Sequence, residues 1–283
     1  MTFFRFSIAL GHKIARDDIS NMASSISYFA FLSLFPLLLG LLAVFSIFLP
    51  PEVIRSELIT FFGQYLPGSL GILQGSINDI TRFRGIFGII GILGLLWSGT
   101  GVFSAVTHAI NKAWEIPYHH PFYIKKPREL GMVAGTGLLF LLSFGTSTLL
   151  TRLGQIQLPI TGILVNVTTI FLAFIFSLVV FMLVHKLSPA TWLSWRHIWP
   201  GAVLSTILFE IAKTIFVFYL NSFSRYQAVY GSVASVIVSL VWIYYSAFIL
   251  LLGAEFSALL FKIKRDGEEF DRISQNNSLI RDL

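Results

Sequence analysis

The chain contains no cysteine and has few charged residues. Without a cysteine among its 283 residues it has no disulfide, no thiol nucleophile and no thiolate metal ligand. Charged side chains make up 12% of the residues, against roughly 25% in a soluble domain. So few charges cannot cover the surface of a chain that is 55% hydrophobic. The composition therefore excludes a soluble globular enzyme, a disordered chain and a disulfide-stapled secreted domain.

Recognised catalytic motifs are also missing. There is no GxxxxGK[ST] or GxSxG sequence, and no HExxH arrangement among the histidines. The adjacent pair His119 and His120 points two ways from one loop, so it makes a weak zinc site. We therefore expect no catalytic residues, no metal and no cofactor. The six histidines are His12, His108, His119, His120, His185 and His197.

What the chain does have is long apolar segments. A helix needs about 20 apolar residues to cross a bilayer core. Six segments meet this requirement: 22–49, 84–112, 130–151, 159–184, 199–220 and 231–253. The first is far too long for the apolar region of a cleavable signal peptide. The sequence predicts an all-α, polytopic membrane protein with six transmembrane helices.

The basic residues predict the orientation of these helices. Of the 20 Lys and Arg residues, fourteen lie in the two terminal segments and in the loops on the same side of the membrane as them. Five lie in the loops on the opposite side. Basic residues are enriched in cytoplasmic loops, so both ends should face the cytoplasm. This bias accounts for the net charge of +6 without a nucleic-acid partner. The partner we expect is the lipid bilayer, and the oligomeric state stays open.

Two further regions are amphipathic rather than spanning. In residues 1–20, Phe3, Phe6, Leu10 and Ile14 share one helical face, which predicts a helix lying flat at the cytoplasmic lipid surface. The first outer loop, 50–84, contains two apolar-periodic stretches that we interpret as short helices packed on the outer face. We expect one domain over residues 1–262, followed by a cytoplasmic polar tail over 263–283.

Charges within the apolar segments are candidates for an intramembrane polar site. Glu210 and Lys213 lie three residues apart in the fifth segment, so they share a helix face and can pair. The pair could be structural, or it could face a cavity as a substrate or proton site. Glu255 follows the sixth apolar segment, where it could be an interfacial carboxylate near Lys262.

Polar residues gather in the cytoplasmic halves of the first two helices. They suggest a hydrated cavity open to the inside, although routine hydrogen bonding between membrane helices explains them equally well. Pro36, in the middle of the first helix, predicts a kink. The candidate cavity-lining residues are Ser24, Ser27, Tyr28, Ser104, His108 and Asn111.

Four stretches, taken in their order and spacing, resemble the YihY/BrkB family of bacterial inner-membrane proteins. They are ASSISYFAFLSLFPLLLG (23–40), LLWSGTGVFSAVTHAINKAWEI (95–116), WRHIWPGAVLSTILFEIAKTIFVFYL (195–220) and YQAVYGSVASVIVSLVWIYYSAFILLLGAEFSALL (226–260). Glu210 and Lys213 match the charged positions of the family's WExxK-like segment, with Phe209 where Trp is frequent. Glu255 matches its GAE segment. The resemblance implies an inner-membrane location and a fold rather than an activity.

Three functions are compatible with these features. The first is a transporter or lipid-handling protein that acts on a small-molecule or lipid substrate through Glu210 and Lys213. The alternative is a non-transporting scaffold of an envelope complex. A ribonuclease, the older label of some family members, comes last, because hydrolysis of RNA normally needs clustered carboxylates with metal. Six helices could form two halves of opposite topology, although the halves show no sequence similarity.

Overall fold

The computed structural model describes residues 3–48, 84–117, 123, 125–135 and 161–281, and within them all regular secondary structure is helical. The elements are α1 (Phe3–Asp17), α2 (Ile19–Phe48), α5 (Arg84–Ala113), α7 (Thr161–Leu187) and α8 (Trp195–Arg281). Residues 125–135 are also helical. The expected outer loop at 50–84, apart from Arg84, and most of the third apolar segment lie outside the described residues.

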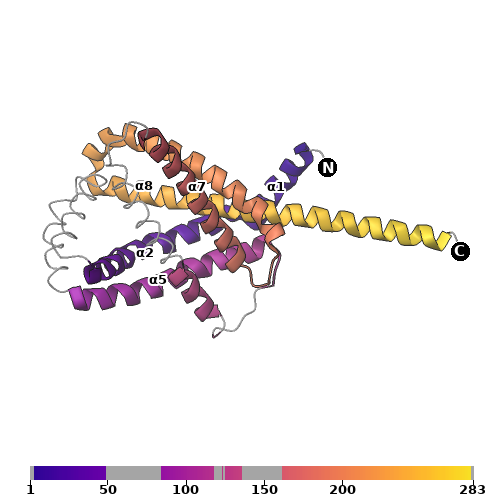
Figure 1. Ribbon diagram of the computed structural model, residues 1–283, viewed down its shortest axis with the longest axis horizontal. Helices are drawn as coiled ribbons and strands as arrows, with labels where there is room; N and C mark the ends of the chain where they lie inside the picture. The colour runs from indigo at the N-terminus through magenta and orange to yellow at the C-terminus, as the bar shows by residue number, and fades with distance from the viewer. Residues whose placement is uncertain (1–2, 49–83, 118–122, 124, 136–160, 282–283) are drawn as a thin grey trace.

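The apolar segments and the helices coincide where both are described. Helix α2 covers the first segment, α5 the second and α7 the fourth. Figure 1 shows α2 and α5 packed side by side, with α7 against α8. Helices α2 and α5 approach closely at Pro36, which lies inside α2. A Cβ added to Gly94 of α5 would be 3.3 Å from the Cβ of Pro36.

Helix α8 doubles back on itself. A straight helix of its 87 residues would be about 130 Å long, with Gly201 and Gly253 far apart. Instead, a Cβ added to Gly201 would overlap the carbonyl oxygen of Gly253. Figure 1 shows the orange part of α8 running out and the yellow part returning beside it. We call Trp195–Tyr219 the first limb and Val236–Arg265 the second limb.

These limbs are the expected fifth and sixth segments. Among the described residues, they are the two helical stretches that are long and apolar enough to cross a membrane, and Ala173–Leu187 of α7 is a shorter apolar stretch. Serine hydrogen bonds join the limbs where the glycines let them approach. Ser205 Oγ donates to the Ile249 carbonyl at 3.0 Å, and Ser257 Oγ accepts from the Gly201 amide at 2.7 Å.

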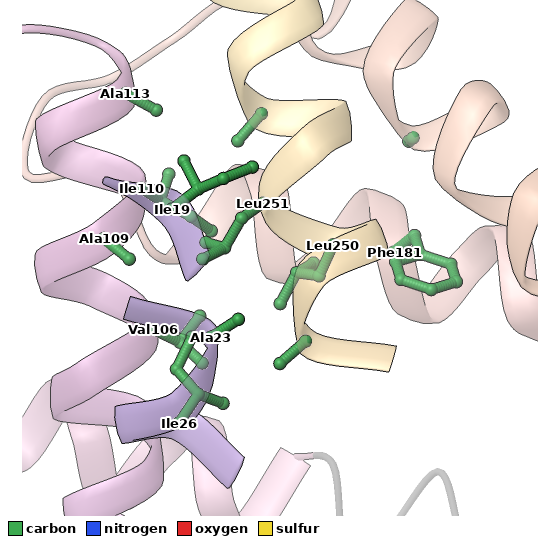
Figure 2. Close-up of a cluster of buried hydrophobic side chains, with 13 residues drawn as sticks. Ile19, Ala23, Ile26, Val106, Ala109, Ile110, Ala113, Phe181, Leu250 and Leu251 are labelled. Atoms are coloured by element: carbon green, nitrogen blue, oxygen red, sulfur yellow. The ribbon is translucent and has the colours of Figure 1, made fainter. Parts of the chain in front are cut away.

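The apolar core lies where α2, α5 and the second limb meet. Figure 2 shows Ile19 of α2 and Ile110 of α5 packed beside Leu251 of α8, with Phe181 of α7 farther along. Ile110 is fully buried, and small residues such as Ala23 and Ala109 let the helices come close. This core holds the end of α1 and the end of α5 against the second limb, which positions the polar site.

Candidate functional site

A buried lysine joins α1 to the second limb of α8. The Lys13 ammonium lies 2.6 Å from Glu255 Oε2 and 2.7 Å from Asp17 Oδ2. It also donates to the Ala113 carbonyl at the end of α5, at 2.8 Å. The Lys13 side chain is 8% exposed and Glu255 is completely buried. A charge with so little access to water needs a partner of opposite sign, and these two residues supply it to each other.

Three more exposed charged residues, Arg16, Glu115 and Lys262, extend the network from this pair. Arg16 donates to both carboxylate oxygens of Asp17, at 2.9 and 3.2 Å. The Arg16 guanidinium also reaches Glu115 Oε1 at 2.8 Å, and Lys262 Nζ lies 3.0 Å from Glu115 Oε2. We call the six residues Lys13, Arg16, Asp17, Glu115, Glu255 and Lys262 the ionic cluster. Its three cations and three carboxylates tie α1, α5 and α8 together.

The cluster shifts the pKa of two of its carboxylates, the buried Asp17 and the more exposed Glu115. Burial is the largest single influence on Asp17 and raises its pKa, but hydrogen bonds and charges from Arg16 and Lys13 outweigh it, so the pKa is lowered. Hydrogen bonds from Lys262 and then Arg16 lower the pKa of Glu115. The same bonds, from Asp17 first, raise the pKa of Arg16. All of these groups are therefore charged at neutral pH.

The backbone at the end of α5 directs Glu115 into the cluster. The Ile116 amide donates to the Asn111 carbonyl at 2.9 Å, and the Glu115 amide donates to the Lys112 carbonyl at 3.0 Å. This is a Schellman motif, in which the residue at the Glu115 position is left-handed and is usually glycine. Glu115 has φ 55°, and so has Asp18 between α1 and α2. Two non-glycine residues thus hold an unfavourable conformation beside the cluster.

The sequence reasoning missed most of this cluster. It placed Glu255 near Lys262, but the structure pairs Glu255 with Lys13 and pairs Lys262 with Glu115. Lys13 was not among the candidate residues, because it lies in the segment 1–20 that we expected to form a helix at the lipid surface. The one available signal was its i, i+4 spacing with Asp17, because nothing local connects Lys13 with a residue so far along the chain.

The second polar group is the pair singled out from the sequence. Lys213 Nζ lies 2.5 Å from Glu210 Oε2, and Ser177 of α7 donates to Glu210 Oε1 at 2.9 Å. Lys213 is 41% exposed and Glu210 is 24% exposed, so the pair lies at the side of the first limb. Ser177 had no place in the sequence prediction, because only the packing of α7 against α8 brings it there.

The candidate cavity-lining residues differ widely in burial. Ser27 and Asn111 are buried, whereas Tyr28 is 61% exposed, Ser24 and His108 are also exposed, and Ser104 is half-buried. Ser24 and Ser27 bond within α2, as Ser27 Oγ does to the Ser24 carbonyl at 3.0 Å. Asn111 Oδ1 accepts from the Ala190 amide at 2.7 Å, which joins α5 to the connection between α7 and α8.

Two buried polar residues were not anticipated. His185 of α7 has Nδ1 2.7 Å from the Phe181 carbonyl and Nε2 3.2 Å from the Leu250 carbonyl. Glu129 is buried and pairs with Lys126 at 3.0 Å. His185 connects α7 to the second limb, whereas Glu129 pairs within its own helical stretch, and neither residue lines the cavity described next.

A cavity of about 160 Å³ lies directly beside the ionic cluster. It is bounded by α1, the end of α5, the connection before α8 and the second limb. Its walls are lined by Lys13, Ala113, Trp114, Glu115, Ile116, Leu193, Ala258, Phe261, Lys262 and Arg265. Hence the cavity shares Lys13, Glu115 and Lys262 with the cluster, but none of its residues belongs to the predicted cavity lining.

The chain is similar to curated bacterial proteins, several of which are named as membrane proteins. YfkH of Bacillus subtilis (strain 168), named a ribonuclease-like protein, is 28% identical over 88% of this chain and 92% of its own length. A UPF0761 membrane protein of Pseudoalteromonas atlantica is 26% identical over 93% and 88%. Another, from Pseudoalteromonas translucida, is 29% identical over 86% and 82%.

No solved structure matches the chain. The family model described as virulence factor BrkB matches residues 10–277, which include all six residues of the ionic cluster as well as Glu210 and Lys213. The relatives named as membrane proteins support a membrane location. The chain belongs to the BrkB family of membrane proteins.

Proposed function

We propose that this chain is a six-span protein of the bacterial inner membrane that transports or otherwise handles an amphiphilic substrate. The observation that carries the proposal is the partly exposed group of Glu210, Lys213 and Ser177 on the side of a membrane-length helix.

An ion pair that serves only packing should be enclosed by protein. Glu210 and Lys213 lie just past the middle of the first limb. Their apolar neighbours Ile207 and Ile211 are about half exposed, and Ile215 is more exposed. A charge at the centre of a bilayer costs about 2.5–3.5 kcal/mol on insertion scales. Water or the polar part of a ligand at this surface would remove that cost, and a ligand that also contacts the apolar neighbours would be an amphiphile.

The gathering of basic residues at one end supports the proposed orientation. The ionic cluster brings Lys13, Arg16 and Lys262 together, and Arg128 donates to carbonyls in the connection after α7. Exposed tryptophans stand at the same connection and the start of α8, as aromatic residues do at a membrane interface. These are Trp192, Trp195 and Trp199. We therefore assign this end, and both chain ends, to the cytoplasmic side.

The test separates a substrate site from a structural pair. Glu210→Gln with Lys213→Met keeps the side-chain volumes and removes both charges, so the double variant should fold. We expect its unfolding temperature in detergent to stay within a few degrees of that of the unchanged protein. Complementation of a deletion phenotype, and retention of co-purified phospholipid measured by mass spectrometry, should both fall sharply.

A matched control replaces an apolar neighbour on the same surface. Ile211→Leu leaves the polar group intact, so it should retain both activity and bound lipid. If the double variant complements fully and keeps its lipid, the pair is structural and the scaffold function is favoured instead.

A ribonuclease function has weaker support. The name of YfkH is the one hint of it. Among the described residues no three His, Asp or Glu side chains stand together in a way that could hold a metal ion. Since metal-assisted hydrolysis of RNA relies on such clusters, we rank this function last.

A further inference from the structure

We propose that the cavity beside the ionic cluster binds a phosphate group, either in a lipid headgroup or in a soluble anion. This site shares no residue with the group at Glu210, and it rests on the proposed function only for the membrane topology. Three observations carry it: the charge of the wall, an unpaired buried donor and the position of the cavity.

The wall of the cavity is rich in cations. Lys13, Lys262 and Arg265 line it, against the single carboxylate of Glu115. Both oxygens of Glu115 are occupied, one by Arg16 at 2.8 Å and one by Lys262 at 3.0 Å. The carboxylate is therefore committed to neighbouring cations. Lys13 and Lys262 are in turn paired with carboxylates of the cluster, so the cation that the wall adds beyond this balanced cluster is Arg265. Guanidinium and ammonium groups are the usual partners of phosphate oxygens.

A buried donor in the wall lacks an acceptor. The indole of Trp114 lines the cavity, and its Nε1 is shielded from water without a hydrogen-bond partner among the described residues. Buried polar groups are almost always paired, so this exception calls for an explanation. Indole N–H can only donate, and the missing partner must therefore be an acceptor. An oxyanion supplies hydrogen-bond acceptors and also neutralises the positive charge of the wall.

The size and position of the cavity suit a phosphate. One water needs only about 10–15 Å³ of such space, so about 160 Å³ leaves room for a phosphate group with part of what it is attached to. Phe261, Ala258 and Leu193 add apolar surface beside the cations. On the proposed topology the cavity lies at the cytoplasmic interface, where lipid phosphates and soluble phosphates are both within reach.

The experiment uses the full chain in nanodiscs of phosphatidylcholine. One arm adds inorganic phosphate and measures the unfolding temperature against sodium chloride of equal ionic strength. The other arm replaces part of the lipid with phosphatidylglycerol and counts retained lipids by native mass spectrometry. Stabilisation in the first arm indicates a soluble anion, and selective retention in the second arm indicates a lipid headgroup.

Variants connect either signal to the cavity. Lys262→Gln with Arg265→Gln should weaken binding by about tenfold or more, because two charged contacts are lost. Arg265→Gln alone keeps all six residues of the ionic cluster and should weaken binding. Lys112→Gln removes an exposed charge near the end of α5 that does not line the cavity, and it should bind like the unchanged protein. Absence of a signal in both arms, or equal signals in all variants, would overturn the proposal.

Discussion

At the scale of single residues, the most deeply buried ion pair of the described structure joins Lys13 and Glu255. Glu255 is completely buried, and its ion-pair partner among the described residues is Lys13. Lys13 has further partners in Asp17 and the Ala113 carbonyl. The two residues therefore depend on each other unequally, and their replacement should have unequal effects.

We expect Lys13→Met to destabilise the fold by about 3–5 kcal/mol, because it strands a buried carboxylate. Glu255→Gln should cost less, about 1–3 kcal/mol, since Lys13 keeps Asp17. In the double variant much of the Lys13→Met penalty should disappear. Thermal unfolding in detergent, analysed as a double-mutant cycle, measures this coupling. Additive effects would show that the two side chains do not stabilise each other.

The lowered pKa values of Asp17 and Glu115 predict a loss of stability in acid. Folding favours their ionised forms, so their contribution is fully present above the ordinary carboxyl pKa of about 4 and is lost as the pH falls through the folded-state values. Glu115 is nearly half exposed and screened by water, so Asp17 should carry most of the effect.

This pH dependence can be followed by unfolding in detergent from pH 7 to pH 3. Stability should be flat with respect to these two groups down to about pH 5 and should fall below it. Asp17→Asn should lower stability at pH 7 and reduce the slope in acid. An unchanged acid slope in that variant would assign the loss to other carboxylates.

At the scale of helices, the contact between the two limbs of α8 depends on glycine. A Cβ at Gly253 would overlap Ser205 Oγ and lie 2.5 Å from the Gly201 carbonyl oxygen. Backbone cannot move aside as a flexible side chain can. The hydrogen bonds from Ser205 and to Ser257 also need this close approach. Small residues therefore set the distance between the limbs.

Gly253→Ala should destabilise the protein by about 1–3 kcal/mol through overpacking, even though alanine is the better helix former. Gly11→Ala is the matched control. A Cβ there meets nothing within 4 Å, so that change should be neutral or should stabilise α1 by about 0.5–1 kcal/mol. In detergent, the unfolding temperature of Gly253→Ala should fall, and that of Gly11→Ala should stay the same or rise. A neutral Gly253→Ala would show that the limbs are less tightly packed.

At the scale of the whole molecule, the ionic cluster and the basic connections occupy one end of the helical bundle. The hydrogen bond between Asn111 and Ala190 brings the connection after α7 to the end of α5. The bond between Glu115 and Lys262 adds the second limb. Charged residues from segments far apart in the sequence thus meet at one end of the bundle, the end that we propose to be cytoplasmic.

Cysteine labelling tests this orientation, and the cysteine-free chain needs no background removed. We expect Ser56→Cys to react with an impermeant maleimide in intact spheroplasts. Ser274→Cys should react only after permeabilisation, because the positive-inside bias places it in the cytoplasm. The reverse pattern would invert the topology and move the proposed phosphate site to the outer face.

Much of the helical framework is predictable from hydropathy along the chain. The apolar segments 22–49, 84–112 and 159–184 correspond to α2, α5 and α7, since length and hydropathy are local properties that a bilayer selects. The spacing of Glu210 and Lys213 likewise brings the two charges within reach through helix geometry alone. The resemblance to the YihY/BrkB family, carried by local motifs, agrees with the match to the BrkB family model.

The partners of the buried charges could not be obtained in this way. Lys13 meets Glu255, Glu115 meets both Arg16 and Lys262, and Ser177 meets Glu210 across helices. Periodicity tells which residues share a face of one helix, but it does not tell which faces of different helices meet. That choice depends on close packing at Gly201 and Gly253 and on how the connections return each helix to the bundle. Only tertiary structure therefore decided where the ionic cluster and its cavity lie, because both are assembled from chain segments that have no local relation to one another.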